Sequence, residues 1–166
     1  MMRRFLQVDV FGERAMLGNP VAVVLDGDGL GDEAMAEIAR WTNLSETTFV
    51  LPPTSAAADY RVRIFTPFGE LPFAGHPTLG TCWAWQSSGG RSRRDGVTVQ
   101  ECGAGLVEVR ETDGRLAFGG PPLVRSGAVD PELVDEVVAA MGLDPGDVED
   151  SQWVDNGPGW MALLLR

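Results

Sequence analysis

The chain has 166 residues, enough for one domain or for one domain and part of another, and 44% of them are hydrophobic. All 13 basic residues are arginines, which excludes a Schiff-base lysine, a pyridoxal phosphate anchor and a P-loop lysine. The net charge of −11 argues against a nucleic-acid partner, and the single histidine excludes a zinc site with several imidazoles. No apolar run approaches the roughly 20 residues of a membrane span, so we expect a soluble cytoplasmic protein without a membrane partner.

The first part of the chain predicts four strands and one helix. Alternating or continuous apolar residues, bounded by glycine, proline and asparagine, indicate the strands. Apolar residues spaced i, i+3, i+4, with acids in the first turn, indicate an amphipathic helix. The strands are expected over 5–11, 21–25, 47–51 and 60–65, and the helix over 32–41.

The segment 77–86 differs from the elements before it. It has no charged residue and no polar face beyond two threonines, which predicts a helix buried in the middle of the domain. Pro77 suits the first helical position, where its missing N–H costs nothing. After a loop, three more strands are expected over 97–102, 106–111 and 115–118.

The glycines and prolines at 119–122 predict a domain boundary. We expect residues 1–119 to form a β-rich domain around the buried helix. We expect residues 120–166 to form the beginning of a second domain, with a helix capped by Asp130 and a strand over 160–165. The predicted fold class is therefore α+β.

Glu46 is the first candidate for chemistry. It stands between the end of a predicted helix and the start of a strand, a junction that can direct a side chain into a cleft. A partly desolvated carboxylate there would have a raised pKa and would serve as a general base or acid. The alternative interpretation is an exposed carboxylate on a turn.

The second candidate lies just before the buried helix. The N–H groups at a helix N-terminus bind a carboxylate or a developing oxyanion, and Gly75 lets the backbone approach a ligand closely. His76 could hydrogen-bond a substrate there, or it could simply cap the helix. Asn19 before Pro20 is either a turn residue or a ligand contact, and Glu70 is interpreted as a surface carboxylate.

These motifs together resemble a known family. The segments Gly18-Asn-Pro-Val-Ala-Val23, Asn43-Leu-Ser-Glu-Thr-Thr-Phe49, Glu70-Leu-Pro-Phe-Ala-Gly-His-Pro-Thr78 and Val154-Asp-Asn-Gly-Pro-Gly-Trp160 are similar to those of the PhzF-like isomerases of phenazine biosynthesis. This family has the diaminopimelate-epimerase-like fold, in which each of two similar domains is a twisted antiparallel sheet wrapped around a central helix. The active site of the family lies in the cleft between the two domains.

The resemblance implies a cofactor-independent isomerase. By similarity, Glu46 takes a proton from a substrate carbon and returns it elsewhere on the molecule, while Gly75 and His76 contact a small carboxylated substrate. Asn19 is a further candidate for substrate binding from its own position before Pro20. The aspartate and the Gly-Ser-Ala loop that the family's second half supplies are absent from this chain. No cofactor or metal is expected.

Two other functions stay open. One is a non-catalytic remnant that keeps the fold as a binding or interaction module. The other is an amino-acid racemase or epimerase that uses two facing thiols. The positions of Cys82 and Cys102 count against it, because neither lies in a glycine-rich loop at a helix start. Because the strand at 160–165 would expose an edge, we expect self-association into a homodimer, or pairing with a complementing second half.

Overall fold

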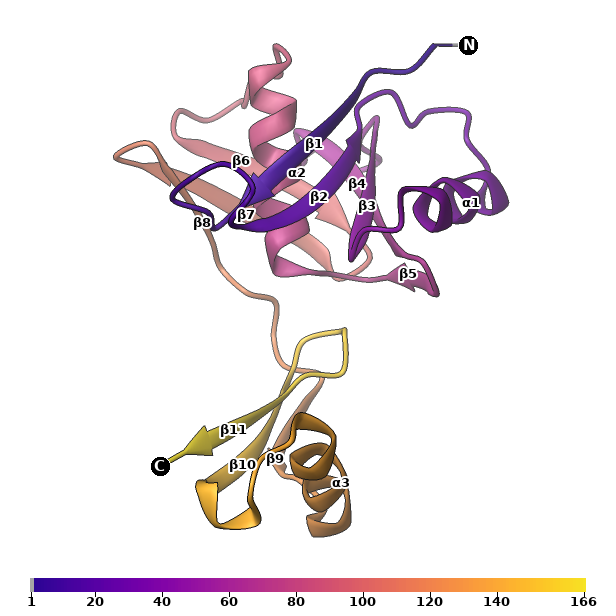
Figure 1. The fold of residues 1–166 in the computed structure, drawn as a ribbon. Coiled ribbons are helices and arrows are strands. Elements are labelled where there is room, and N and C mark those ends of the chain that lie inside the picture. Colours follow the sequence, from indigo (N-terminus) through magenta and orange to yellow (C-terminus); the bar gives the residue numbers. More distant parts are fainter. Residues whose placement is uncertain (1) are drawn as a thin grey trace. The chain divides into compact units, whose positions relative to one another are not determined.

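The computed structural model describes residues 2–166 and divides into two compact units (Figure 1). The first unit extends to Gly120 and the second runs from Pro121 to Arg166. None of the helices in the described part of the chain is long and apolar enough to cross a membrane.

The first unit is a curled sheet around a helix. Its strands follow the order β1-β2-β3-β4-β6-β7-β8, and β5 pairs with β4. The strands are β1 (Phe5–Val10), β2 (Asn19–Val24), β3 (Glu46–Leu51), β4 (Tyr60–Thr66), β5 (Gly69–Leu71), β6 (Val97–Cys102), β7 (Gly105–Thr112) and β8 (Arg115–Phe118). The helices are α1 (Asp32–Thr42) and α2 (Gly75–Ser87).

The sheet is mixed, which corrects the expectation of a purely antiparallel one. β2 pairs with β3 in parallel, and β4 pairs with β6 in parallel, while the other pairs are antiparallel. A parallel pair needs a crossover connection, and a helix provides it in both cases. Helix α1 lies between β2 and β3 in the chain, and α2 lies between β5 and β6.

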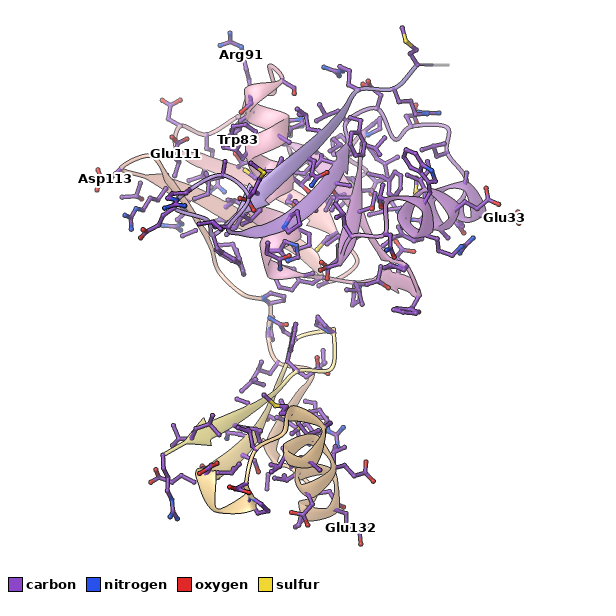
Figure 2. All side chains as sticks on the ribbon, viewed as in Figure 1. Glu33, Trp83, Arg91, Glu111, Asp113 and Glu132 are labelled. Carbon is purple, nitrogen blue, oxygen red and sulfur yellow. The ribbon has the colours of Figure 1, made fainter. Side chains whose placement is uncertain are left out.

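Helix α2 runs through the inside of the curled sheet, as its lack of a polar face predicts (Figure 1). Gly80 allows this close packing, because a Cβ atom there would lie 2.4 Å from Cγ1 of Val21 and 2.9 Å from Cγ2 of Val10. Two details of the prediction are wrong. The helix begins at Gly75, so Pro77 is its third residue, and Trp83 is 51% exposed (Figure 2).

The two faces of the sheet carry two hydrophobic clusters. On the inner face, residues such as Val21 and Ile64 pack against α2. On the outer face, Met35 and Ala39 of α1 pack against Phe49 and Phe65, whose rings meet edge to face at 5.7 Å. The alternation of side chains along the central strands thus buries both faces.

The second unit is a small sheet with one long helix. Its elements are β9 (Arg125–Ala128), α3 (Pro131–Met141), the short helix η1 (Pro145–Asp147), β10 (Val148–Asp155) and β11 (Met161–Leu165). The strand order is β11-β10-β9. Asp130 accepts a hydrogen bond from the backbone N–H of Glu132, and Gly142 ends α3 in the left-handed conformation, as the sequence indicates.

Candidate active site

Three polar residues that are distant in sequence meet at the N-terminal end of α2. Asn19 is the first residue of β2, Glu46 is the first residue of β3, and His76 is the second residue of α2. Because β2 and β3 are parallel neighbours, with Val21 opposite Glu46, both strands begin at the same edge of the sheet. The fold thus brings Asn19, Glu46 and His76 together, and Gly75 lies directly before His76 in α2.

The side chains of these residues are in contact. His76 Nε2 lies 3.3 Å from Glu46 Oε2, and the Asn19 side-chain nitrogen lies 3.2 Å from His76 Nδ1. An amide nitrogen can only donate, so His76 Nδ1 is the acceptor in this bond. With this orientation of the Asn19 amide, the neutral tautomer that fits the contact is the one protonated on Nε2, the nitrogen that faces Glu46.

Burial shifts both titratable groups toward their neutral forms. The side chains of Glu46 and His76 are only 15% and 10% exposed. Desolvation raises the pKa of Glu46 and lowers the pKa of His76, because burial disfavours the charged form of each. A carboxylate with a raised pKa is a stronger base, and one that is better matched to proton transfer near neutral pH.

Two atoms of the site are buried without a well-formed hydrogen bond. Among the described residues, Glu46 Oε2 and His76 Nε2 have no partner that meets hydrogen-bond geometry, although they face each other. Buried polar atoms in native proteins nearly always have partners, and an unpaired one needs an explanation. A ligand that contacts both atoms would supply the missing bonds.

The first turn of α2 adds hydrogen-bond donors beside this pair. The N-cap residue, Ala74, has no side-chain cap, and the turn contains no acidic residue. The backbone N–H groups of Gly75 and His76 have no partner within the helix and carry the positive end of its dipole, which suits a carboxylate. Gly75 also has a packing role, since a Cβ atom there would lie 3.0 Å from the Phe118 ring.

The other candidate residues lie elsewhere. Glu70 forms a two-bond ion pair with Arg63, at distances of 2.6 and 2.7 Å, and is held on the surface. Cys82 is buried, and desolvation raises the pKa of its thiol to about 11, which makes it a poor base at neutral pH. No group of three or more metal-binding side chains is present in the part of the chain that the structure describes.

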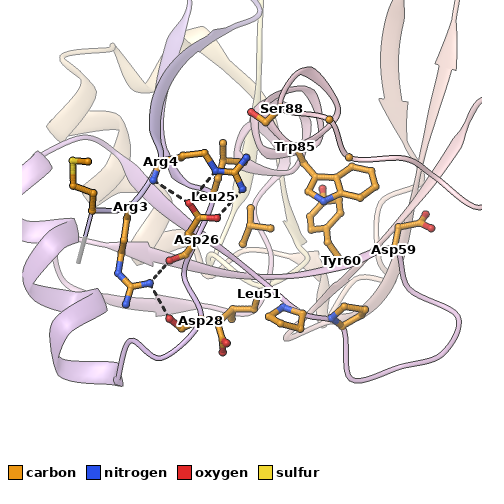
Figure 3. A pocket seen from close by; sticks show the side chains of 16 residues that line it. Arg3, Arg4, Leu25, Asp26, Asp28, Leu51, Asp59, Tyr60, Trp85 and Ser88 are labelled. Carbon is orange, nitrogen blue, oxygen red and sulfur yellow. Dashed lines mark hydrogen bonds and ion pairs between the residues drawn. The ribbon is translucent and has the colours of Figure 1, made fainter.

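Two large hollows in the described part of the first unit are not lined by Glu46 or His76. One, of about 690 Å³, lies between the Arg4–Asp26 ion pair and the stacked rings of Tyr60 and Trp85 (Figure 3). Two of its three acids are already paired, since Asp26 accepts from Arg4 at 2.7 Å and Asp59 accepts two backbone N–H bonds. The other, of about 780 Å³, lies between β1 and α2. The candidate site therefore rests on the contacts of Glu46 and His76.

Two further residues near the site are not identifiable as functional from the sequence. Thr48 and Thr81 are fully buried, and their hydroxyl groups are hydrogen-bonded to each other between β3 and α2. Threonine is common in strands and is tolerated in helices, so neither position stands out in the sequence. Only the folded arrangement shows that they face each other.

Comparisons with known proteins all identify relatives of one family. The PhzC-PhzF family model, described as phenazine biosynthesis-like protein, matches residues 8–139. A Schizosaccharomyces pombe protein named Antisense-enhancing sequence 1 is 43% identical over 169 residues, which cover 97% of this chain and 57% of that protein. A trans-2,3-dihydro-3-hydroxyanthranilate isomerase of Pseudomonas aeruginosa is 54% identical over 83 residues, which cover 50% of this chain and 30% of that enzyme.

Solved structures agree with these relatives. A Bacillus anthracis phenazine biosynthesis protein of the PhzF family superposes with a TM-score of 0.77 at 27% identity, over 100% of this chain and 57% of that one. The chain thus spans about half the length of the curated relatives it matches. The expected fold class and the resemblance are confirmed.

Proposed function

Because the chain belongs to the PhzC-PhzF family of phenazine biosynthesis-like proteins, we propose that it is an isomerase, or the Glu46-bearing part of one. In this proposal residues 1–119 are its first domain, residues 120–166 begin a second, and the substrate is a small carboxylated metabolite. The observation that supports it most directly is the 3.3 Å contact between Glu46 and His76 beside the N-terminus of α2.

The reaction consists of two proton transfers within one molecule. The Glu46 carboxylate takes a proton from a substrate carbon, so that a C–H bond breaks and an O–H bond forms. The resulting carboxylic acid returns the proton to another carbon of the same molecule, and the carboxylate is regenerated. Substrate and product have the same composition and oxidation state, so this proposal requires no cofactor and no metal.

The other groups of the site hold the substrate and its developing charge. The backbone N–H groups of Gly75 and His76 bind the substrate carboxylate at the positive end of the helix dipole. The Nε2–H of His76 donates to an oxygen that becomes negative as the carbon loses its proton. Asn19 keeps this proton on Nε2 by donating to Nδ1, and its side chain borders the space that the substrate occupies.

The test is conversion of trans-2,3-dihydro-3-hydroxyanthranilate, the substrate in the name of the Pseudomonas aeruginosa relative, by the full chain. Glu46→Gln keeps the size of the side chain but cannot accept a proton, so we expect kcat to fall at least about 100-fold, with KM changed much less. The matched control is Glu33→Gln on the exposed start of α1, where the side chain points into solvent (Figure 2). Unchanged kcat in Glu46→Gln would refute the proposed base.

The second candidate function is a binding module without turnover. It is supported by the buried, unpaired atoms Glu46 Oε2 and His76 Nε2, which a bound ligand would satisfy without any proton transfer. A protein that binds anthranilate, with a change in the NMR signals of His76, but converts nothing would support this function. Turnover that depends on Glu46 would exclude it.

A further inference from the structure

We propose that Thr48 and Thr81 are positioning residues, whose hydroxyl–hydroxyl bond sets the spacing between Glu46 and His76. The inference rests on the proposed function, in which Glu46 and His76 act together. It adds two residues that touch neither the substrate nor the reacting atoms.

The bond has an ordinary length and is fully buried. Thr81 Oγ1 donates to Thr48 Oγ1 at 2.8 Å, and both residues are 0% exposed. A buried hydroxyl without a partner is costly, so the pair strongly favours the one arrangement in which both are bonded. Two valines would fill almost the same volume without specifying that arrangement.

The spacing along the two elements matches. Thr48 follows Glu46 by two residues in β3, a rise of about 7 Å, and Thr81 follows His76 by five residues in α2, a rise of about 7.5 Å. The Glu46–His76 contact and the Thr48–Thr81 bond are therefore successive links between the same strand and the same helix. Sliding α2 along β3 to separate Glu46 from His76 would break the second link.

The bond continues to the third element of the site. Thr48 Oγ1 donates in turn to the backbone carbonyl of Ala22 at 3.3 Å, in β2, three residues after Asn19. Both hydroxyl protons are thus used, in the direction from Thr81 through Thr48 to Ala22. The three elements that carry His76, Glu46 and Asn19 are joined by this one chain of hydrogen bonds.

Thr81 makes this bond in place of a local one. A threonine inside a helix commonly donates to the carbonyl four residues earlier, as Thr78 does to Ala74 at 2.9 Å. The hydroxyl of Thr81 reaches across to the strand instead. Thr78 and Thr81 thus use their hydroxyl groups differently within one helix, which indicates that the Thr81 hydroxyl helps to align α2 with β3.

The experiment uses the only histidine of the chain as a reporter. In tag-free protein, an NMR pH titration gives the pKa of His76 without ambiguity. An ionised carboxylate at 3.3 Å favours the imidazolium, so Glu46→Gln should lower the His76 pKa by roughly 1. In a Thr81→Val background, where the two side chains are less well aligned, we expect this effect of Glu46→Gln to be less than half as large.

Two variants separate positioning from a general loss of stability. Thr81→Ser keeps the hydroxyl and should restore the full effect of Glu46→Gln. Thr98→Val removes another buried hydroxyl, which accepts from Gln86 at the other end of α2 at 3.1 Å, and should leave the effect unchanged. If Thr81→Val does not fold, Thr48→Val breaks the same bond from the strand side.

The possible outcomes test the positioning role separately from the proposed isomerase function. A full effect of Glu46→Gln in the Thr81→Val background, or no effect of Glu46→Gln in the wild-type protein, would overturn the positioning role. A reduced effect in a protein that converts no substrate would leave the positioning role standing and refute the isomerase. In an active protein, Thr81→Val should lower kcat about 10-fold or more, because misplacements of 1 Å are costly in catalysis.

Discussion

At the scale of single residues, the site consists of groups that the sequence identifies separately and the fold brings together. Glu46 and His76 are each predictable from their motif and from their position beside a helix or strand end. Their contact is not, because 30 residues separate them and the Asn19 bond to His76 spans 57. The contact between Thr48 and Thr81 is not predictable, because a single sequence does not show which buried hydroxyl groups face each other.

Burial of Glu46 gives stability a defined dependence on pH. Its pKa in the folded protein is raised, so the native state holds this proton more tightly than the unfolded chain does. The stability that results is fully present below the ordinary pKa of glutamate and is lost as the pH rises through the raised value.

Urea unfolding of the wild-type protein and of Glu46→Gln between pH 4 and 8 measures this dependence. We expect the wild-type protein to lose stability relative to the variant as the pH rises. The NMR titration of His76 in both proteins gives the contribution of this histidine to the difference, and Glu33→Gln reports the effect of removing one charge from the surface. A difference that stays constant over this range would contradict desolvation of Glu46.

At the scale of elements, the burial of α2 is well predicted from the sequence, but the residue at which the helix begins is not. The absence of charge predicts its burial, but its first residue is missed because Ala74 gives no capping signal. The strand β5, with three residues, is too short for a periodic pattern. Parallel pairing of the strands follows from the helical crossovers, which become clear only once the strand order is known.

Gly80 tests how closely α2 approaches the sheet. Alanine is the better helix former, but its Cβ atom would lie 2.4 Å from Val21 Cγ1, so we expect Gly80→Ala to lower stability by about 1–3 kcal/mol. Gly69→Ala, with no atom within 4 Å of the added Cβ, is the control and should change stability by less than about 0.5 kcal/mol. Val21→Ala should restore part of the loss in Gly80→Ala. Equal stability of both alanine variants would contradict the close packing.

At the scale of the whole molecule, the chain spans about half the length of its curated relatives, and we propose that it associates with a partner chain. Strand β11 pairs with β10 and forms an edge of its sheet within the described residues, with Leu164 57% and Leu165 46% exposed. Exposed apolar edge strands favour pairing with another chain. A homodimer, or a complex with a complementing half, is the assembly that we propose.

Light scattering behind a sizing column measures this association. We expect a mass above the 17.8 kDa of one chain, increasing with protein concentration. Leu164→Lys places a charge on the edge and should shift the mass toward that of one chain. A single mass near 17.8 kDa at high concentration would refute self-association.

Proton transfer by Glu46 is tested most directly by following solvent deuterium into the carbon skeleton of the substrate. The protein is incubated in D₂O with trans-2,3-dihydro-3-hydroxyanthranilate, and product and recovered substrate are analysed by NMR and mass spectrometry. We expect carbon-bound deuterium with the wild-type protein and with Glu33→Gln, and incorporation at least about 100-fold slower with Glu46→Gln. Equal incorporation by Glu46→Gln and by the wild-type protein would contradict a role for Glu46 as the base.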